Sequence, residues 1–140
     1  MKYISTRGGM SAAPYSAILL EGLATDGGLV VPETVPQVTP EQIESWRGLD
    51  YPQLAAEILS LYATDIPRED LDAMCRAAYS TDKFVSEQIV PVTPLEGASP
   101  IGQISLVGLS EGPTLAFKDM AMQFLGQALE YVLAQSDRTL

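Results

Sequence analysis

The segment GPTLAFKD, residues Gly112 to Asp119, places a single lysine where a predicted strand is followed by a long helix. Upstream, residues 104–109 (ISLVGL) have the apolar character of a short buried strand, and the glycine, proline and hydroxyl residues of 110–114 predict a turn. Downstream, apolar side chains recur at helical spacing: Met120, Phe124, Leu125, Ala128, Leu129, Val132 and Leu133. Lys118 is therefore expected in the first turn of a helix with a wide apolar stripe.

Stability alone does not favour a lysine there, because a surface cation at the positive end of the helix macrodipole loses roughly 0.3–1 kcal/mol. A phosphate-binding P-loop is excluded, since Phe117 and Asp119 stand where that motif needs glycine and a hydroxyl residue. Two interpretations of Lys118 stay open. It either forms an imine with a carbonyl cofactor at the mouth of a sheet, or it is an incidental lysine whose amine lies in water.

Composition bounds the class of protein. The chain has 140 residues, of which 46% are hydrophobic, enough for one domain or for a small domain plus part of another. No apolar run approaches the length of a membrane span, and residues 1–7 turn polar before a signal-peptide core could form. The net charge of −10 is spread along the chain and argues against nucleic-acid binding. We expect a soluble, cytoplasmic protein that binds neither nucleic acid nor a membrane.

The chemistry available to the chain is narrow. The sequence has no histidine, which excludes Ser-His and Cys-His nucleophile pairs and imidazole metal sites, and we expect no metal. Its one cysteine, Cys75, cannot form an internal disulfide and shares the apolar face of a helix with Leu71, Met74 and Ala78. A buried structural thiol is expected. Acid–base chemistry would fall to lysine, aspartate, glutamate or tyrosine.

The fold class is predicted as α/β: a small, mainly helical N-terminal domain with short strands, then the first strand-helix unit of a second domain. Four helices are expected before residue 80: at about 13–23, from about 39 to before Gly48, at 51–62 and at 65–79. The second of them begins with a capping box at 39–42. A short strand is expected at 29–31. The third helix should bury Leu54, Ile58, Leu61 and Tyr62. Prolines and glycines between 91 and 102 mark a boundary, so the predicted domains are 1–97 and 98–140.

The last unit predicts a continuation. A strand followed by a crossover helix delivers the chain to a parallel neighbour, and residues 136–140 come where that next strand should start. We expect an N-terminal fragment of a longer enzyme, inactive by itself. The apolar face of helix 119–134 and the edge of strand 104–109 should then be exposed and favour self-association.

Two blocks of sequence resemble the threonine synthase family, whose members are pyridoxal-phosphate enzymes of the tryptophan-synthase-β fold. One is the lysine segment, residues 112–119. The other is the series YISTRG (3–8), YSAILLEGLA (15–24) and DGGLVVP (26–32), which matches the opening segments of the family in order and spacing. One departure is Val30, where the family usually has an aromatic residue.

The resemblance implies a lyase that converts O-phosphohomoserine and water to L-threonine and phosphate, in threonine biosynthesis. Lys118 would be both the catalytic and the cofactor-binding residue, holding pyridoxal 5'-phosphate through an imine. Thr114 is expected as a turn hydroxyl, and Phe117 as core packing beside the cofactor. Asp119 is explained by the helix dipole, although it could also orient Lys118.

Two alternatives stay open beside this interpretation. Arg7, with Ser5 and Thr6, could bind a phosphate or carboxylate, or could form a surface salt bridge. The helical part could instead be an oligomerisation or regulatory module without catalytic activity. A yellow colour that borohydride removes would favour the enzyme, whereas a colourless protein that self-associates would favour the module.

Overall fold

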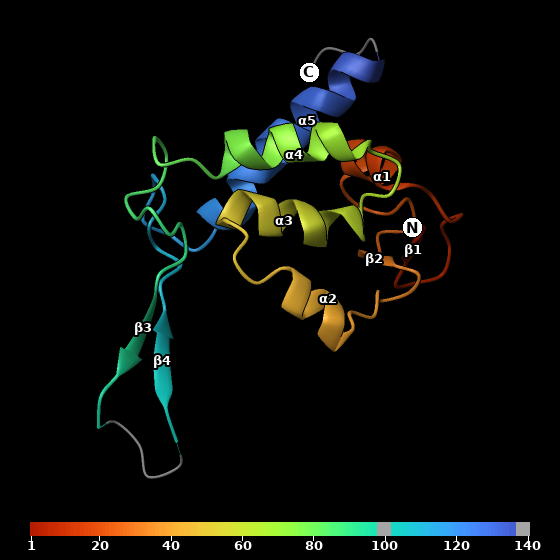
Figure 1. The fold of residues 1–140 in the computed structure, drawn as a ribbon. Helices are drawn as coiled ribbons and strands as arrows, with labels where there is room; N and C mark the ends of the chain where they lie inside the picture. Colours follow the sequence, from red (N-terminus) through yellow and green to blue (C-terminus); the bar gives the residue numbers. More distant parts are fainter. Residues whose placement is uncertain (98–101, 137–140) are drawn as a thin grey trace.

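The structure is a computed structural model that describes residues 1–97 and 102–136, so the predictions made for Pro100 and for residues 137–140 lie outside the described residues. The elements in chain order are β1 (Tyr3–Ser5), α1 (Tyr15–Glu21), β2 (Val30–Pro32), α2 (Pro40–Ser45), α3 (Tyr51–Ser60), α4 (Arg68–Ala78), β3 (Val92–Leu95), β4 (Ile104–Val107) and α5 (Asp119–Ser136). The helices form one body, from which the β3–β4 hairpin projects (Figure 1). The predicted fold class, mainly helical with short strands, is confirmed.

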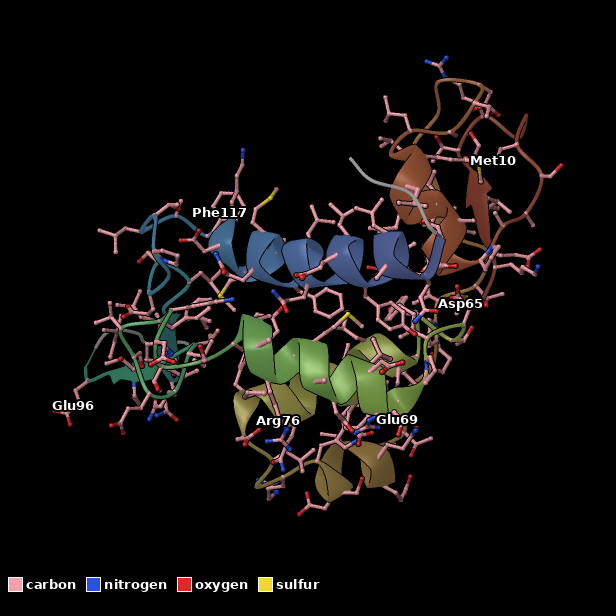
Figure 2. The ribbon with its side chains drawn as sticks, turned by 90° about the horizontal axis from the view of Figure 1, so that it is seen from above. Met10, Asp65, Glu69, Arg76, Glu96 and Phe117 are labelled. Atoms are coloured by element: carbon pink, nitrogen blue, oxygen red, sulfur yellow. The ribbon has the colours of Figure 1, made fainter. Side chains whose placement is uncertain are left out.

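Three helices build the core. α4 packs against both α3 and α5, and α1 packs against α5 (Figures 1 and 2). The buried side chains come from these helices and from the segments beside α4: Ala56, Ala63, Ile66, Leu71, Met74, Cys75, Ala78, Tyr79, Phe84, Ile89, Phe124 and Ala128. Cys75 is fully buried, as predicted, and burial raises the pKa of its thiol to about 11. A thiol in this state is structural.

Local capping signals explain where the helices begin. α2 starts with the predicted capping box, in which the Thr39 side chain accepts from the backbone N–H of Gln42 and the Gln42 side chain accepts from the backbone N–H of Thr39. α3 starts with a second box, built in the same way from Asp50 and Gln53. At the other end of a helix, Gly22 is the C-cap of α1, and its positive φ of 72° suits glycine.

The buried face of α3 differs from the prediction. Ile58 was expected in the core but is 42% exposed, whereas Ala56 is fully buried and Leu59 packs against the core. Leu54 lines a shallow surface hollow beside α2. The buried face of α3 is therefore rotated from the predicted one by about one residue, or roughly 100° around the helix axis. Alanine allows α3 to approach α4 closely, and this small side chain gives little hydrophobic signal in the sequence.

The strands form two antiparallel pairs. In the first, Tyr3 of β1 lies opposite Pro32 of β2. In the second, Val92 of β3 lies opposite Val107 of β4. The strand predicted at 104–109 is present at 104–107, but its expected burial is wrong, because both faces are exposed. Its neighbour is an antiparallel strand from the proline-rich segment, where only a boundary was expected.

α5 also differs from the prediction. Its apolar face was expected to be exposed, but Phe124, Ala128 and Val132 are buried, and α5 packs on α4. The predicted domain division at residue 97 falls in the connection between β3 and β4, and α5 shares one core with the helices before it. The division stays a prediction. No helix among the described residues is both long enough and apolar enough to cross a membrane.

Candidate functional site

The loop between β4 and α5, residues 108–118, carries Lys118 and is tied to the segment that follows α4. The Gly108 backbone N–H donates to the carbonyl of Pro91 at 2.8 Å, and the Val85 N–H donates to the carbonyl of Glu111 at 2.9 Å. These bonds hold the near end of the loop against the body. The backbone of residues 108–111 is therefore fixed on the N-terminal side of Lys118.

The far end of the loop closes on the carboxylate of Asp119. This side chain is 3% exposed, and its Oδ2 accepts from the backbone N–H of Thr114 at 2.8 Å and from the Thr114 hydroxyl at 2.9 Å. Gly112 packs directly on it, since a Cβ at position 112 would overlap the Cβ of Asp119 and lie 2.6 Å from its Oδ2. The prediction that Thr114 is a turn hydroxyl agrees with this geometry.

Lys118 is the residue immediately before α5, within one position of its predicted place. Its carbonyl accepts from the N–H groups of Ala121 at 3.0 Å and Met122 at 2.9 Å, both in the first turn of the helix. Its side chain is exposed, and within residues 1–97 and 102–136 it takes part in none of the ion pairs. Phe117 is 67% exposed beside the N-terminal end of α5 (Figure 2), so it is not part of the core of the described residues, and its packing beside a cofactor stays a prediction.

The start of α5 is anchored by Tyr79, the residue that follows α4. Its hydroxyl donates to the carbonyl of Met120 at 2.9 Å. The ring packs edge-on against Tyr51 at a centroid distance of 5.0 Å and lies beside Phe84. Burial raises the pKa of Tyr79, and nearby Tyr51 and Cys75 raise it further. The phenol therefore stays protonated at neutral pH and keeps its hydrogen bond to the helix.

The second predicted cluster, around Arg7, lies elsewhere. The segment with β1 and the loop at Met10 occupies the opposite end of α5 from Phe117 (Figure 2). Arg7 donates from Nη1 to the backbone carbonyl of Asp26 at 3.2 Å. Among the described residues it forms no salt bridge, and its two predicted roles stay predictions. Thr6 accepts from the N–H of Leu29 through its hydroxyl oxygen at 3.0 Å.

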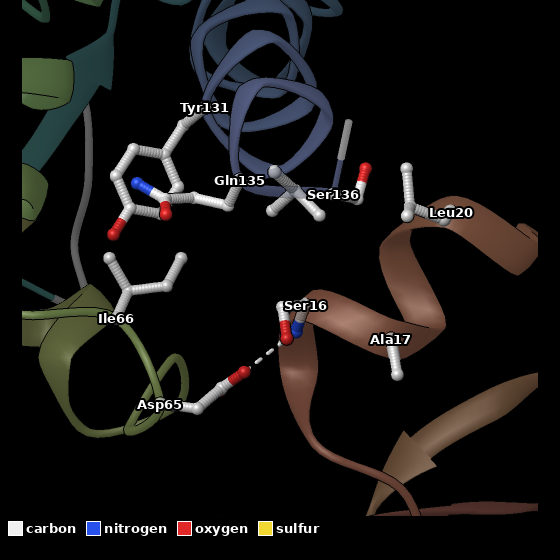
Figure 3. A pocket seen from close by; sticks show the side chains of 9 residues that line it. Ser16, Ala17, Leu20, Asp65, Ile66, Tyr131, Gln135 and Ser136 are labelled. Atoms are coloured by element: carbon white, nitrogen blue, oxygen red, sulfur yellow. Dashed lines mark hydrogen bonds between the residues drawn. The ribbon is translucent and has the colours of Figure 1, made fainter. Parts of the chain in front are cut away.

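A cavity of about 360 Å³ lies between α1, the turn after α3 and the C-terminal part of α5 (Figure 3). Its lining residues are Ser16, Ala17, Leu20, Asp65, Ile66, Tyr131, Val132, Gln135 and Ser136. Lys118 is not among them. Asp65 accepts from the backbone N–H of Tyr15 at 3.2 Å and of Ser16 at 2.9 Å. It thus supplies the N-terminal cap that α1 lacks locally.

Burial alone would raise the pKa of Asp65, but hydrogen bonds from Ser16, and more weakly from Tyr15, outweigh it and lower the pKa. The charged carboxylate is therefore the form that caps α1. Sequence reasoning missed this role because the partners are about 50 positions apart and no local pattern joins them. Among the described residues, no three or more Cys, Asp or Glu side chains gather as a metal site would require.

The chain is similar to known proteins over its whole length. The family model described as "Threonine synthase N terminus" matches residues 2–79. The chain is 50% identical to the threonine synthase of Corynebacterium glutamicum, with 100% of this chain and 29% of that protein covered. It is 47% identical to that of Methylobacillus glycogenes, with 99% of this chain and 30% of that protein covered.

Solved structures agree. The structure of a PLP-bound threonine synthase from Brucella melitensis superposes with a TM-score of 0.88 at 40% identity, covering 99% of this chain and 28% of that one. Threonine synthase from yeast superposes with a TM-score of 0.86 at 34% identity, covering 99% of this chain and 28% of that one. The chain thus spans less than a third of the length of these proteins.

Proposed function

The chain belongs to the threonine synthase family, and we propose that it provides the lysine-bearing segment of an enzyme that converts O-phosphohomoserine and water to L-threonine and phosphate. The enzyme is a carbon–oxygen lyase acting on phosphate, and its substrate is a small molecule. We also propose a cytoplasmic location, and no nucleic-acid or membrane partner. The net charge of −10 supports the absence of a nucleic-acid partner.

The observation that carries this proposal is the placement of Lys118. Its amine is exposed at the start of α5, on a loop whose backbone is fixed at both ends, and no ion pair of the described residues includes it. These features fit pyridoxal phosphate, which the Brucella melitensis relative binds. Lys118 would hold the cofactor covalently through its amine, as a lysine can and an arginine cannot.

When bound, the cofactor supplies an electron sink for charge that develops on substrate carbons. When it is not bonded to the cofactor, the Lys118 amine would be able to move protons at the α and β carbons of the substrate. Asp119 does not compete for this work, because its Oδ2 is engaged with Thr114 and the side chain is buried. No metal is needed in this scheme.

The test replaces Lys118 with arginine in a full-length threonine synthase that carries this segment. We expect Lys118→Arg to abolish threonine formation and to remove the absorption band of the lysine-bound cofactor, with the fold intact. Lys83→Arg is the matched control, since it makes the same exchange at another lysine of the chain. Substantial threonine formation by Lys118→Arg would show that the assignment is wrong.

A further inference from the structure

Lys118 and Asp119 are neighbours in sequence, yet their charged groups lie in different environments. The lysine is exposed, whereas the Asp119 side chain is 3% exposed and its Oδ2 accepts two hydrogen bonds from Thr114. A buried carboxylate is costly to desolvate and is retained only where donors satisfy it. Both of these donors belong to the loop that carries the lysine.

The hydrogen bonds of Asp119 restrain the loop backbone. They join position 114 to the first residue of α5 and so enclose Leu115, whose φ of 57° is unusual for a residue with a side chain. The backbone of Gly112 also packs against the Asp119 side chain, so closely that a Cβ at position 112 would overlap it. Tyr79 holds the first turn of the helix through the carbonyl of Met120.

Resting on the proposed role of Lys118, we propose that Asp119 is a positioning residue for it. Through Thr114, the buried carboxylate fixes the backbone from which Lys118 projects. Because this carboxylate is engaged inside the loop, it does not hold the amine in an ion pair. The amine therefore starts from a fixed point and stays available to bind a carbonyl group. Small errors in such placement are costly, since a displacement of about 1 Å can reduce a rate about 100-fold.

The test uses a full-length threonine synthase that carries this segment. Asp119→Ala removes both hydrogen bonds between Asp119 and Thr114, and Thr114→Val removes the one from the hydroxyl. We call this pair of hydrogen bonds the closure of the loop, and we expect both variants to lower kcat about 10- to 100-fold. KM for O-phosphohomoserine should change by less than about 3-fold, because substrate binding is not what the closure supplies. The absorption band of the lysine-bound cofactor should weaken or shift. Glu130→Ala, on an exposed position of the same helix, should match the unmodified enzyme in all three.

Conservative variants separate positioning from charge. Asp119→Asn keeps an oxygen that can accept from Thr114, and Thr114→Ser keeps the hydroxyl. We expect both to stay within about 3-fold of the unmodified kcat, against the 10-fold or greater loss in the disruptive variants. Amide hydrogen exchange in residues 114–118 should be at least about 10-fold faster in Asp119→Ala, with the exchange of α4 unchanged. Unchanged exchange of α4 shows that the protein remains folded.

Several results would overturn the inference. Unchanged kcat and absorbance in both Asp119→Ala and Thr114→Val would do so, and so would an effect on KM alone. If Asp119→Asn were as impaired as Asp119→Ala, the negative charge would be the required feature, and the positioning role would be wrong. Failure of the proposed function looks different: Lys118→Arg would then keep both turnover and the absorption band.

Discussion

Two loops of this molecule are closed by an aspartate in the same way, at opposite ends of the helical body. In the first, Asp26 accepts from the hydroxyl of Ser5 at 2.6 Å and from the N–H groups of Gly9 at 2.7 Å and Gly28 at 2.9 Å. In the second, Asp119 accepts from the N–H and hydroxyl of Thr114. Each aspartate accepts from a hydroxyl and from backbone N–H, two groups for Asp26 and one for Asp119, and each packs against a glycine.

The two loops differ in what they do with the neighbouring cation. The guanidinium of Arg7 is bonded to the carbonyl of Asp26, and its side chain lies against Gly27 and Gly28. Lys118 has no such bond among the described residues, and its side chain extends into solvent. In the loop closed by Asp26 the cation, Arg7, is therefore hydrogen-bonded to the protein, whereas in the loop closed by Asp119 the cation, Lys118, is exposed. Only the second arrangement suits covalent chemistry.

The largest expected effect comes from the glycines on which the two closures depend. A Cβ at Gly28 would overlap the Ser5 hydroxyl and lie 3.0 Å from Oδ1 of Asp26, while one at Gly112 would overlap the Asp119 side chain. We expect Gly28→Ala and Gly112→Ala each to lower the free energy of unfolding by about 1–3 kcal/mol. Urea denaturation of the 140-residue chain measures this effect.

The matched control for these glycines is Gly126→Ala in α5, where no atom outside the neighbouring backbone of the helix lies within 4 Å of the added Cβ. Alanine in a helix interior should stabilise the chain there by roughly 0.5–1 kcal/mol. If Gly28→Ala were destabilising and Gly112→Ala were not, the second loop would be less tightly closed than the first, and the comparison between them would fail.

An acid titration tests the Asp26 closure by itself. The hydrogen bonds from the Ser5 hydroxyl and the Gly28 N–H lower the pKa of Asp26 below its ordinary value of 3.8. A lowered folded-state pKa stabilises the fold fully above the unfolded value, and that stability is lost as the pH falls through the folded value. We expect Tm to fall between about pH 5 and pH 2, and to fall less steeply in Asp26→Asn.

Asp65 also has a lowered pKa and contributes in the same direction, so the difference between the two proteins, and not the total loss, reports on Asp26. The measurement is Tm against pH, by circular dichroism, for both proteins in the same buffers. Parallel curves would mean that Asp26 has the same pKa in the folded and unfolded chain, and that its hydrogen bonds do not favour the charged form.

Local signals in the sequence were enough to predict much of this fold. The helix that opens at Thr39 follows from a capping box, and the helix up to Tyr79 follows from its apolar period and from Pro67 before its first turn. The position of Lys118 before a long helix could also be predicted, because turn residues and apolar period change at the same point. Such features depend on neighbours within about four residues.

What the sequence did not reveal depends on distant partners. The β3–β4 pairing joins segments across a proline-rich stretch, and Pro94 inside β3 weakens any strand signal there. The cap that Asp65 gives to α1 and the anchoring of α5 by Tyr79 both span more than 40 positions. The burial of Asp119 could not be predicted either, because its sequence also fits an exposed residue of the first helical turn.

The smallest expected effect concerns Arg7, and it tests whether the first loop is purely structural. Arg7→Ala removes one hydrogen bond to a carbonyl and the packing of an exposed side chain, so we expect a loss of about 0.5–1.5 kcal/mol at most. In a full-length threonine synthase that carries this segment, kcat and KM should be unchanged, because the segment that bears Arg7 lies at the other end of α5 from the Lys118 loop (Figure 2). A large rise in KM with little loss of stability would instead show that Arg7 contacts an anionic group of the substrate, and that both cations serve one site.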